Sequence, residues 1–212
     1  MSEILDIFDD KMNHIGTADR EVVHKEGYWH QTFHCWIITK HDGRGYVLVQ
    51  KRASCKKTEP NKLDISAAGH LLAGETKEDG IREVQEELGI STQFSHMIDL
   101  GIRVSSSGVP GIKCNKEFCH VVLLEDNTPL YEHCLQENEV SALVEIPIDE
   151  GLKLFSGEES SICVKALIEE GQKRIDIIKI TVNDFIYRID PYYLKIFIMA
   201  DLYFKGSKYL AI

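Results

Sequence analysis

The sequence lacks an apolar run long enough to cross a bilayer as a helix. Its longest such run, residues 196–200, ends at Asp201, whereas a transmembrane helix needs about 20 apolar residues. The sequence also lacks a basic N-terminal stretch of the kind found in signal and transit peptides, because its opening segment carries Glu3 and Asp6 and no base. We therefore expect a cytoplasmic protein without a membrane partner.

Positive charge is scarce as well. The chain has 24 Lys and Arg against 34 Asp and Glu, which gives a formal net charge of −10. Nonspecific nucleic-acid binding depends on clustered Lys and Arg at the phosphates, so we expect no nucleic-acid partner. An anionic substrate would need a divalent cation and a few local basic residues to offset the negative field.

The cysteines are too few and too widely spaced for a disulfide scaffold or a zinc ribbon. They stand at positions 35, 55, 114, 119, 134 and 163, and we interpret them as reduced thiols. A hydrophobic fraction of 43% and a charged fraction of 27% are typical of globular proteins. The length of 212 residues predicts a catalytic domain, residues 1–150, with a C-terminal helical extension, residues 151–212, packed on the same domain.

Both strand-like and helix-like patterns occur along the chain. Strands are predicted at residues 33–39, 46–51, 117–124 and 140–146 from their β-branched and aromatic content. Helices are predicted at residues 76–88, 147–155, 162–170 and about 190–204. Strands and helices without a regular alternation predict an α/β (α+β) fold with a mixed sheet flanked by helices. The residues that recognise the rest of the substrate are expected in a loop at 105–113 and in the helical tail.

The predicted helix at 76–88 carries acidic residues where they destabilise it. Glu83, Glu86 and Glu87 project from the face opposite its apolar residues. Glu86 and Glu87 lie in the last turn, where the helix dipole disfavours negative charge by roughly 0.3–1 kcal/mol each. A run of charged residues on a helix is most often a solvent-exposed face. Here two energetic costs fall on the same few carboxylates, which favours a functional role for them. Clustered carboxylates suit Mg²⁺, which takes its remaining ligands from water and substrate phosphates.

The segment around this helix resembles the Nudix box, Gly-x5-Glu-x7-Arg-Glu-U-x-Glu-Glu-x-Gly-U, in which U is aliphatic. The matching residues are Gly69, Glu75, Arg82, Glu83, Val84, Glu86, Glu87, Gly89 and Ile90. Six residues rather than seven separate Glu75 from Arg82, a shortening that we expect where the loop enters the helix. The resemblance implies a Nudix-like fold and a hydrolase that cleaves a phosphoanhydride bond in a nucleoside-diphosphate-linked or related small diphosphate compound.

The resemblance also implies roles for particular residues. The implied ligands of Mg²⁺, or alternatively Mn²⁺, are Glu83, Glu86, Glu87, the backbone carbonyl near Gly69, and Glu117 on a later strand. Glu86 and Glu117 are alternative general bases, and the loss of Glu87 is expected to abolish activity. Arg82 is expected to be the counter-charge of Glu75, with Gly69 and Gly89 as structural positions of the box. Lys51 and Arg52 end a strand and are either substrate-phosphate ligands or an exposed basic pair.

Residues outside the box resemble the Nudix branch that is similar to isopentenyl-diphosphate isomerase. The isomerase requires a cysteine before the Gly-His pair of its box, and Ala68 stands there instead. Glu117 matches the isomerase's second acidic residue, and His70, with His24 and His30, resembles its metal-binding histidines.

The missing cysteine and the intact carboxylates favour hydrolysis over isomerisation, and a non-catalytic ligand-binding module is a third alternative. Hydrogen-bonded packing is the commoner role of such histidines, and we expect no structural zinc site. The tail aromatics are expected in the core or in a homodimer contact.

Overall fold

The computed structural model describes residues 3–109, 112–169 and 171–212. The strands are β1 Ile4–Phe8, β2 His14–Asp19, β3 Trp29–His41, β4 Arg44–Arg52, β5 Leu63–Asp64, β6 Ala67–His70, β7 Met97–Val109, β8 Lys113–Glu125, β9 Val140–Pro147, β10 Ile162–Ile168 and β11 Arg174–Ile180. The α-helices are α1 Arg20–Glu26, α2 Ile81–Leu88, α3 Ile148–Ser156 and α4 Tyr192–Phe204, with short 3₁₀ turns at Phe94–His96, Leu130–Glu132 and Val182–Asp184.

The strands form one mixed sheet organised around β3. Its main path runs β11-β10-β9-β4-β3-β1-β2. The first half of β3 pairs with β6 and the second half with β4, both antiparallel, while β8 runs parallel along the other edge of β3. β6 and β4 therefore lie along the same edge of β3, one after the other, and separate from each other where the pairing changes. The candidate active site lies at this separation.

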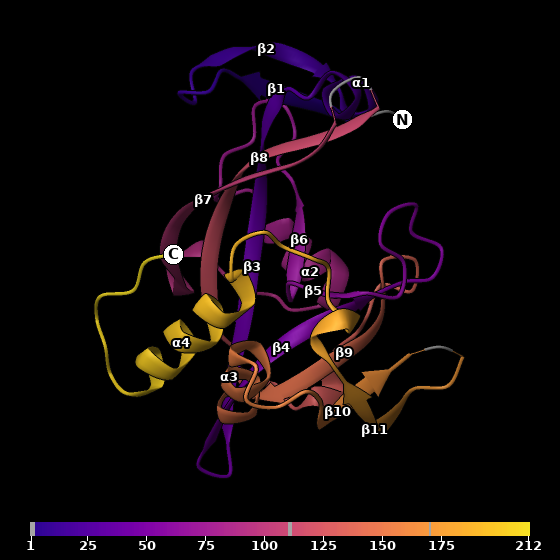
Figure 1. Ribbon diagram of the computed structural model, residues 1–212, viewed down its shortest axis with the longest axis vertical. Coiled ribbons are helices and arrows are strands. Elements are labelled where there is room, and N and C mark those ends of the chain that lie inside the picture. The colour runs from indigo at the N-terminus through magenta and orange to yellow at the C-terminus, as the bar shows by residue number, and fades with distance from the viewer. Residues whose placement is uncertain (1–2, 110–111, 170) are drawn as a thin grey trace.

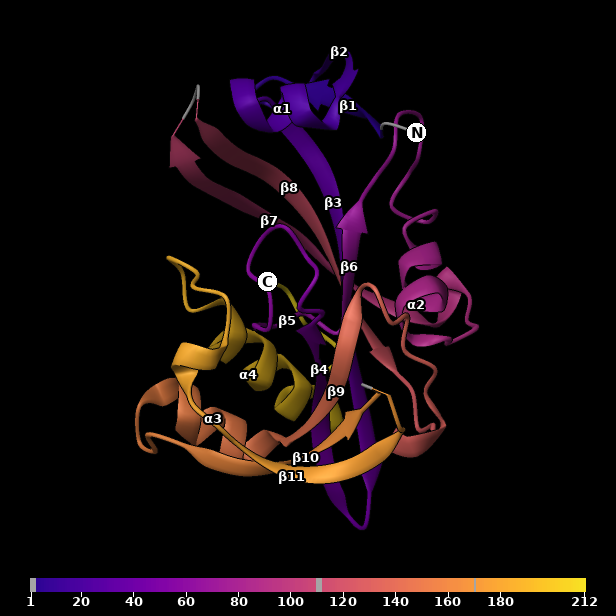
Figure 2. The ribbon, with the colours of Figure 1, turned by 90° about the vertical axis from the view of Figure 1, so that its right-hand side faces the viewer.

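Helices cover both faces of this sheet (Figure 2). On one face, Val84 and Leu88 of α2 pack with Phe33 of β3 in a buried apolar cluster. On the other face, α3 and α4 pack over Trp36 in a second cluster. The first two strands and α1 form one end of the molecule (Figure 1). The expected mixed sheet between helices is thus confirmed. Within the described residues, no helix is long and apolar enough to span a membrane.

The strand predictions are confirmed, but the chain after residue 150 is not only helical. The four predicted strands lie within β3, β4, β8 and β9, and the helices expected at 147–155 and 190–204 are α3 and α4. The helix predicted at 162–170 is wrong, because residues 162–168 form β10, which pairs with β9 and β11. Residue 170 lies outside the described residues. Burial alternates along β10, with Val164 and Ala166 buried and Lys165 exposed, so the short apolar pattern has period 2.

One further expectation is corrected. Residues 105–109 belong to β7 and residue 113 begins β8, so the expected loop at 105–113 is largely strand, and residues 110–111 lie outside the described residues. The division of the chain at residue 150, which falls inside α3, stays a prediction.

The helix that carries the carboxylates begins later than its pattern predicts. α2 starts at Ile81 after an N-cap at Gly80. Thr76 donates from its N and its Oγ1 to Oδ2 of Asp79, both at 2.8 Å, but this pair closes the turn before the helix. A Cβ atom on Gly80 would lie 2.4 Å from Cγ of Phe33. The helix ends at Leu88, the predicted last residue, and Gly89 caps it in the left-handed conformation.

Candidate active site

Glu87 of α2 reaches into the divergence between β4 and β6. Its Oε2 accepts hydrogen bonds from Nε2 of Gln50 on β4 and from the backbone N of Ala68 on β6, both at 3.0 Å. Glu87 is 5% exposed and Gln50 is 2% exposed. Burial, and then the neighbouring charge of Glu83, raise the pKa of Glu87 to about 8. One oxygen of this carboxylate is therefore fixed by two donors, and the other is available to a ligand.

Gly69 on β6 makes room for a second carboxylate, that of Glu83, whose side chain is 13% exposed. A Cβ atom at this position would lie 2.1 Å from Oε1 of Glu83. Since real Cβ atoms do not come so close to an oxygen, any other residue would displace the Glu83 side chain. The glycine that opens the box thus allows a carboxylate to lie against the strand backbone.

Arg82 connects the loop and the helix of this site. Its Nε and Nη2 donate to the two oxygens of Glu75 at 3.0 and 3.2 Å, and Nη2 also donates to the carbonyl of His70 at 2.8 Å. Its Nη1 donates to Oε1 of Glu83 at 2.5 Å and lies 3.6 Å from Glu86, whose side chain is 55% exposed. The expected pairing of Arg82 with Glu75 is present despite the shortened spacing between them.

The buried carboxylates fit a divalent cation. Glu83 and Glu87 bring two acidic groups into a buried place, and burial raises the pKa of both. Uncompensated buried charge is costly, so a cation here would stabilise the ionised forms. All the donors are oxygens, the ligand type that Mg²⁺ and Mn²⁺ prefer. Glu83, Glu87 and the strand at Gly69 could hold such an ion, with Glu86 at the solvent side.

Glu117 lies with a different set of donors. It stands on β8 opposite His30 of β3, with 4.0 Å between its Oε1 and Nε2 of His30. The rings of His24, His30 and His70 have centroids 5.0–5.3 Å apart, and one potential ligand nitrogen from each lies within 4.8 Å of the others. Burial lowers the pKa of His30 and His70, which keeps their imidazoles neutral. The structure therefore groups histidines that were expected in ordinary packing.

The two predicted phosphate ligands are not equally available. The guanidinium group of Arg52 donates from Nε and Nη2 to the carbonyl of Thr58, at 3.3 and 3.1 Å. Lys51 stands beside it at the end of β4. Lys56, which the sequence did not single out, forms an ion pair with Glu139, and its charge lowers the pKa of Glu87 against the larger effect of burial.

The box geometry has its counterpart in known proteins. A model of the NUDIX domain matches residues 29–164. The chain belongs to the Nudix hydrolase family. It is 38% identical over 173 residues to an uncharacterized Nudix hydrolase of Clostridium acetobutylicum, covering 81% of this chain and 84% of that protein. It is 36% identical over 129 residues to an isopentenyl-diphosphate Delta-isomerase of Cutibacterium acnes, covering 58% and 62%.

A solved structure supports the fold. The crystal structure of a Deinococcus radiodurans protein superposes with a TM-score of 0.53 at 19% sequence identity, covering 74% of this chain and 91% of that one. The fold and the Nudix hydrolase class predicted from the box are confirmed. Nudix hydrolases generally use divalent metal ions, in keeping with the donors on α2.

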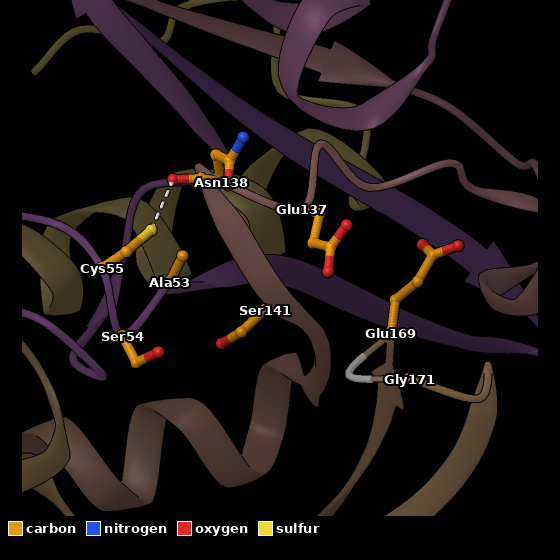
Figure 3. Close-up of a pocket in the computed structure, with 8 residues that line it drawn as sticks. All are labelled: Ala53, Ser54, Cys55, Glu137, Asn138, Ser141, Glu169 and Gly171. Atoms are coloured by element: carbon orange, nitrogen blue, oxygen red, sulfur yellow. Dashed lines mark hydrogen bonds between the residues drawn. The ribbon is translucent and has the colours of Figure 1, made fainter.

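A cavity of about 320 Å³ lies elsewhere in this Nudix enzyme. Figure 3 shows its lining, in which Glu137 and Glu169 come from the segments before β9 and after β10, and Sγ of Cys55 donates to the carbonyl of Asn138 at 3.3 Å. None of the predicted site residues lines it.

Gln50 was missed by the sequence reasoning because a lone glutamine in a strand gives no signal of a role.

Proposed function

We propose that this Nudix enzyme hydrolyses a phosphoanhydride bond in a small diphosphate compound, with Mg²⁺, or Mn²⁺ in its place, as the ion. The observation that carries the proposal is the pairing of buried Glu87 with partly buried Glu83 beside Gly69, an all-oxygen donor set where β4 and β6 diverge. When bound, the ion supplies a Lewis acid for the diphosphate and lowers the pKa of water. The nucleoside-diphosphate-linked compounds are the first substrate class to test.

The residues of the chain have distinct tasks in this proposal. Gln50 and the N–H of Ala68 orient Glu87, and Arg82 holds Glu75 and Glu83 in place. A water molecule attacks phosphorus, the bridging P–O bond breaks, and a carboxylate accepts the proton from water. Glu86 and Glu117 are the two candidates for this general base. Glu86 has the solvent access and Glu117 has the neighbouring imidazoles.

Isomerisation of isopentenyl diphosphate is the second candidate function. The grouping of His24, His30 and His70 near Glu117 favours it, because these residues resemble the metal ligands of the isomerase. The residue before Gly69 is Ala68, which has no acid–base group for an allylic carbon. The family assignment and this missing group favour hydrolysis.

A substrate panel tests the proposal. It should contain nucleoside di- and triphosphates, nucleotide sugars, dinucleoside polyphosphates and isopentenyl diphosphate, each with Mg²⁺ and with Mn²⁺. Glu87→Gln is expected to abolish hydrolysis, whereas Glu150→Gln, a carboxylate on α3 paired with Arg44, should leave it unchanged. Turnover of isopentenyl diphosphate without phosphate release would favour the isomerase, and inactivity across the panel would favour a non-catalytic binding module. The cytoplasmic location, the homodimer and the absence of a nucleic-acid partner stay predictions.

A further inference from the structure

Polar residues form a row across the sheet on the face that α4 covers. Arg103 of β7 lies opposite Cys119 of β8, Cys119 lies opposite Thr32 of β3, and Thr32 lies opposite His70 of β6. Directly opposed residues of adjacent strands project to the same face. The row therefore runs from Arg103 to the histidine cluster, and its last member directly follows Gly69. The adjoining row consists of Ser105, Glu117 and His30.

Arg103 is buried at the far end of this row, with its side chain 7% exposed. Its Nε donates to Oδ2 of Asp190 at 3.1 Å, and its Nη2 donates to Oδ1 of the same carboxylate. The guanidinium carbon lies 4.4 Å from the ring centroid of Tyr192. Its Nη1 is buried and has no hydrogen-bond partner among the residues that the structure describes. Asp190 directly precedes Pro191, which is the N-cap residue of α4.

Arg188 approaches the same place from the segment before α4. Its Nη2 donates to Oδ1 of Asp64 at 2.9 Å, and its side chain is 16% exposed. Its Nε is also buried without a partner in the described part of the chain. The same Oδ1 of Asp64 accepts a hydrogen bond from the hydroxyl of Tyr193 at 3.2 Å, and Tyr193 directly follows Tyr192, whose ring lies beside the guanidinium group of Arg103. The two arginines thus converge on one region of the sheet face.

A buried guanidinium N–H without an acceptor is unfavourable, and native proteins rarely leave such groups unpaired. Here each arginine is neutralised on one side by a carboxylate and keeps one buried donor. We propose that Arg103 and Arg188 bind a second anionic group of the substrate, a phosphate or a carboxylate, beyond the diphosphate that is cleaved. This inference rests on the proposed function and narrows it. Guanidinium groups suit both anions, whereas an apolar alcohol chain would leave both donors unpaired.

Binding of inorganic phosphate without metal, measured by calorimetry in the presence of a chelator, tests the site directly. Wild-type protein should bind phosphate, and Arg103→Gln and Arg188→Gln should each bind it at least 10-fold more weakly. The matched control is Arg174→Gln, which removes an exposed arginine paired with Asp176 on β11 and should leave the affinity unchanged. Asp190→Asn should tighten binding, because it removes the negative charge beside Arg103. If the ion pair were purely structural, Asp190→Asn would not raise the affinity for phosphate while Arg103→Gln lowers it.

Steady-state kinetics on a substrate found in the panel gives a second readout. Arg103→Gln should raise KM about 10-fold for a diphosphate with a further acidic group while kcat changes less than about 2-fold. If Arg103→Gln fails to fold, Arg188→Gln and Arg103→Lys provide the same comparison. The absence of phosphate binding by wild type, or an equal affinity in the arginine variants and in Arg174→Gln, would overturn the inference. In that case the loss of hydrolysis in Glu87→Gln would still support the proposed hydrolase activity, so each proposal can be overturned without the other.

Discussion

The carboxylates of α2 and the arginine pair Arg103 and Arg188 are both clusters of largely buried charge, but the chain assembles them differently. Glu83 and Glu87 belong to one helix, and their immediate neighbours Gly69 and Arg82 lie in the same short stretch of sequence. Arg103 and Arg188 come from distant segments, and they lie near the adjacent residues Tyr192 and Tyr193 only because β7 pairs with β8 and the segment before α4 folds over the sheet. The first cluster follows from local spacing, and the second requires the whole sheet.

After the loss of Glu87 itself, the largest expected effect is at Gly69, where the first cluster depends on close packing against a strand. Gly69→Ala should lower kcat/KM by roughly 10²-fold or more, because the added Cβ displaces the Glu83 carboxylate. In a Glu83→Gln background the same substitution should cost little further activity. Kinetics of the single and double variants measure this coupling. Independent, additive effects would contradict the role given to Gly69.

Gln50 is expected to have the next largest effect. Gln50→Met keeps the volume of this buried side chain but removes its hydrogen bond to Glu87. We expect Mg²⁺ or Mn²⁺ to bind about 10–100-fold more weakly, because partners that orient a ligand have effects of this size. Calorimetric titration with metal alone measures it. Gln85→Met, on the exposed side of α2, is the control, and an equal affinity in both variants would remove Gln50 from the site.

The shortened entry to α2 predicts a stability effect of moderate size. Gly80→Ala should destabilise the protein by about 1–3 kcal/mol, because its Cβ would overlap the ring of Phe33. Denaturant unfolding with and without Phe33→Leu gives the test. The smaller side chain should reduce the cost of Gly80→Ala, and an unchanged cost would mean that the contact with Phe33 does not limit this position.

The smallest effect concerns the ion pair behind the arginine cluster. The hydrogen bond from Arg103 lowers the pKa of Asp190, so the pair stabilises the fold above the ordinary pKa of about 3.9 and this contribution is lost as the pH falls through the lower folded value. Asp190→Asn should reduce stability near neutral pH by less than about 1 kcal/mol. The difference in unfolding free energy between wild type and Asp190→Asn should shrink below about pH 4. Unfolding curves at several pH values test this, and a constant gap would contradict it.

The carboxylate cluster could be predicted from the sequence, whereas the arginine pair could not. The acidic face of α2 was predictable because helical spacing places Glu83 and Glu87 together whatever the rest of the chain does. The partner of Arg82 was predictable for the same local reason. The convergence of Arg103 and Arg188 was not, since it depends on strand register and on the path before α4. β10 was mistaken for a helix because a short apolar segment fits both periods.

The parallel pairing of β3 and β8 has a consequence for how this chain is made. Trp29 pairs with Lys116 and Ile38 with Glu125, so the central strand acquires this neighbour only after more than half of the chain has been synthesised. Until then one long edge of β3 presents unpaired backbone N–H and C=O groups. Such an edge is prone to pair with other chains. Fragments that end before β8 should therefore aggregate more readily than the full chain.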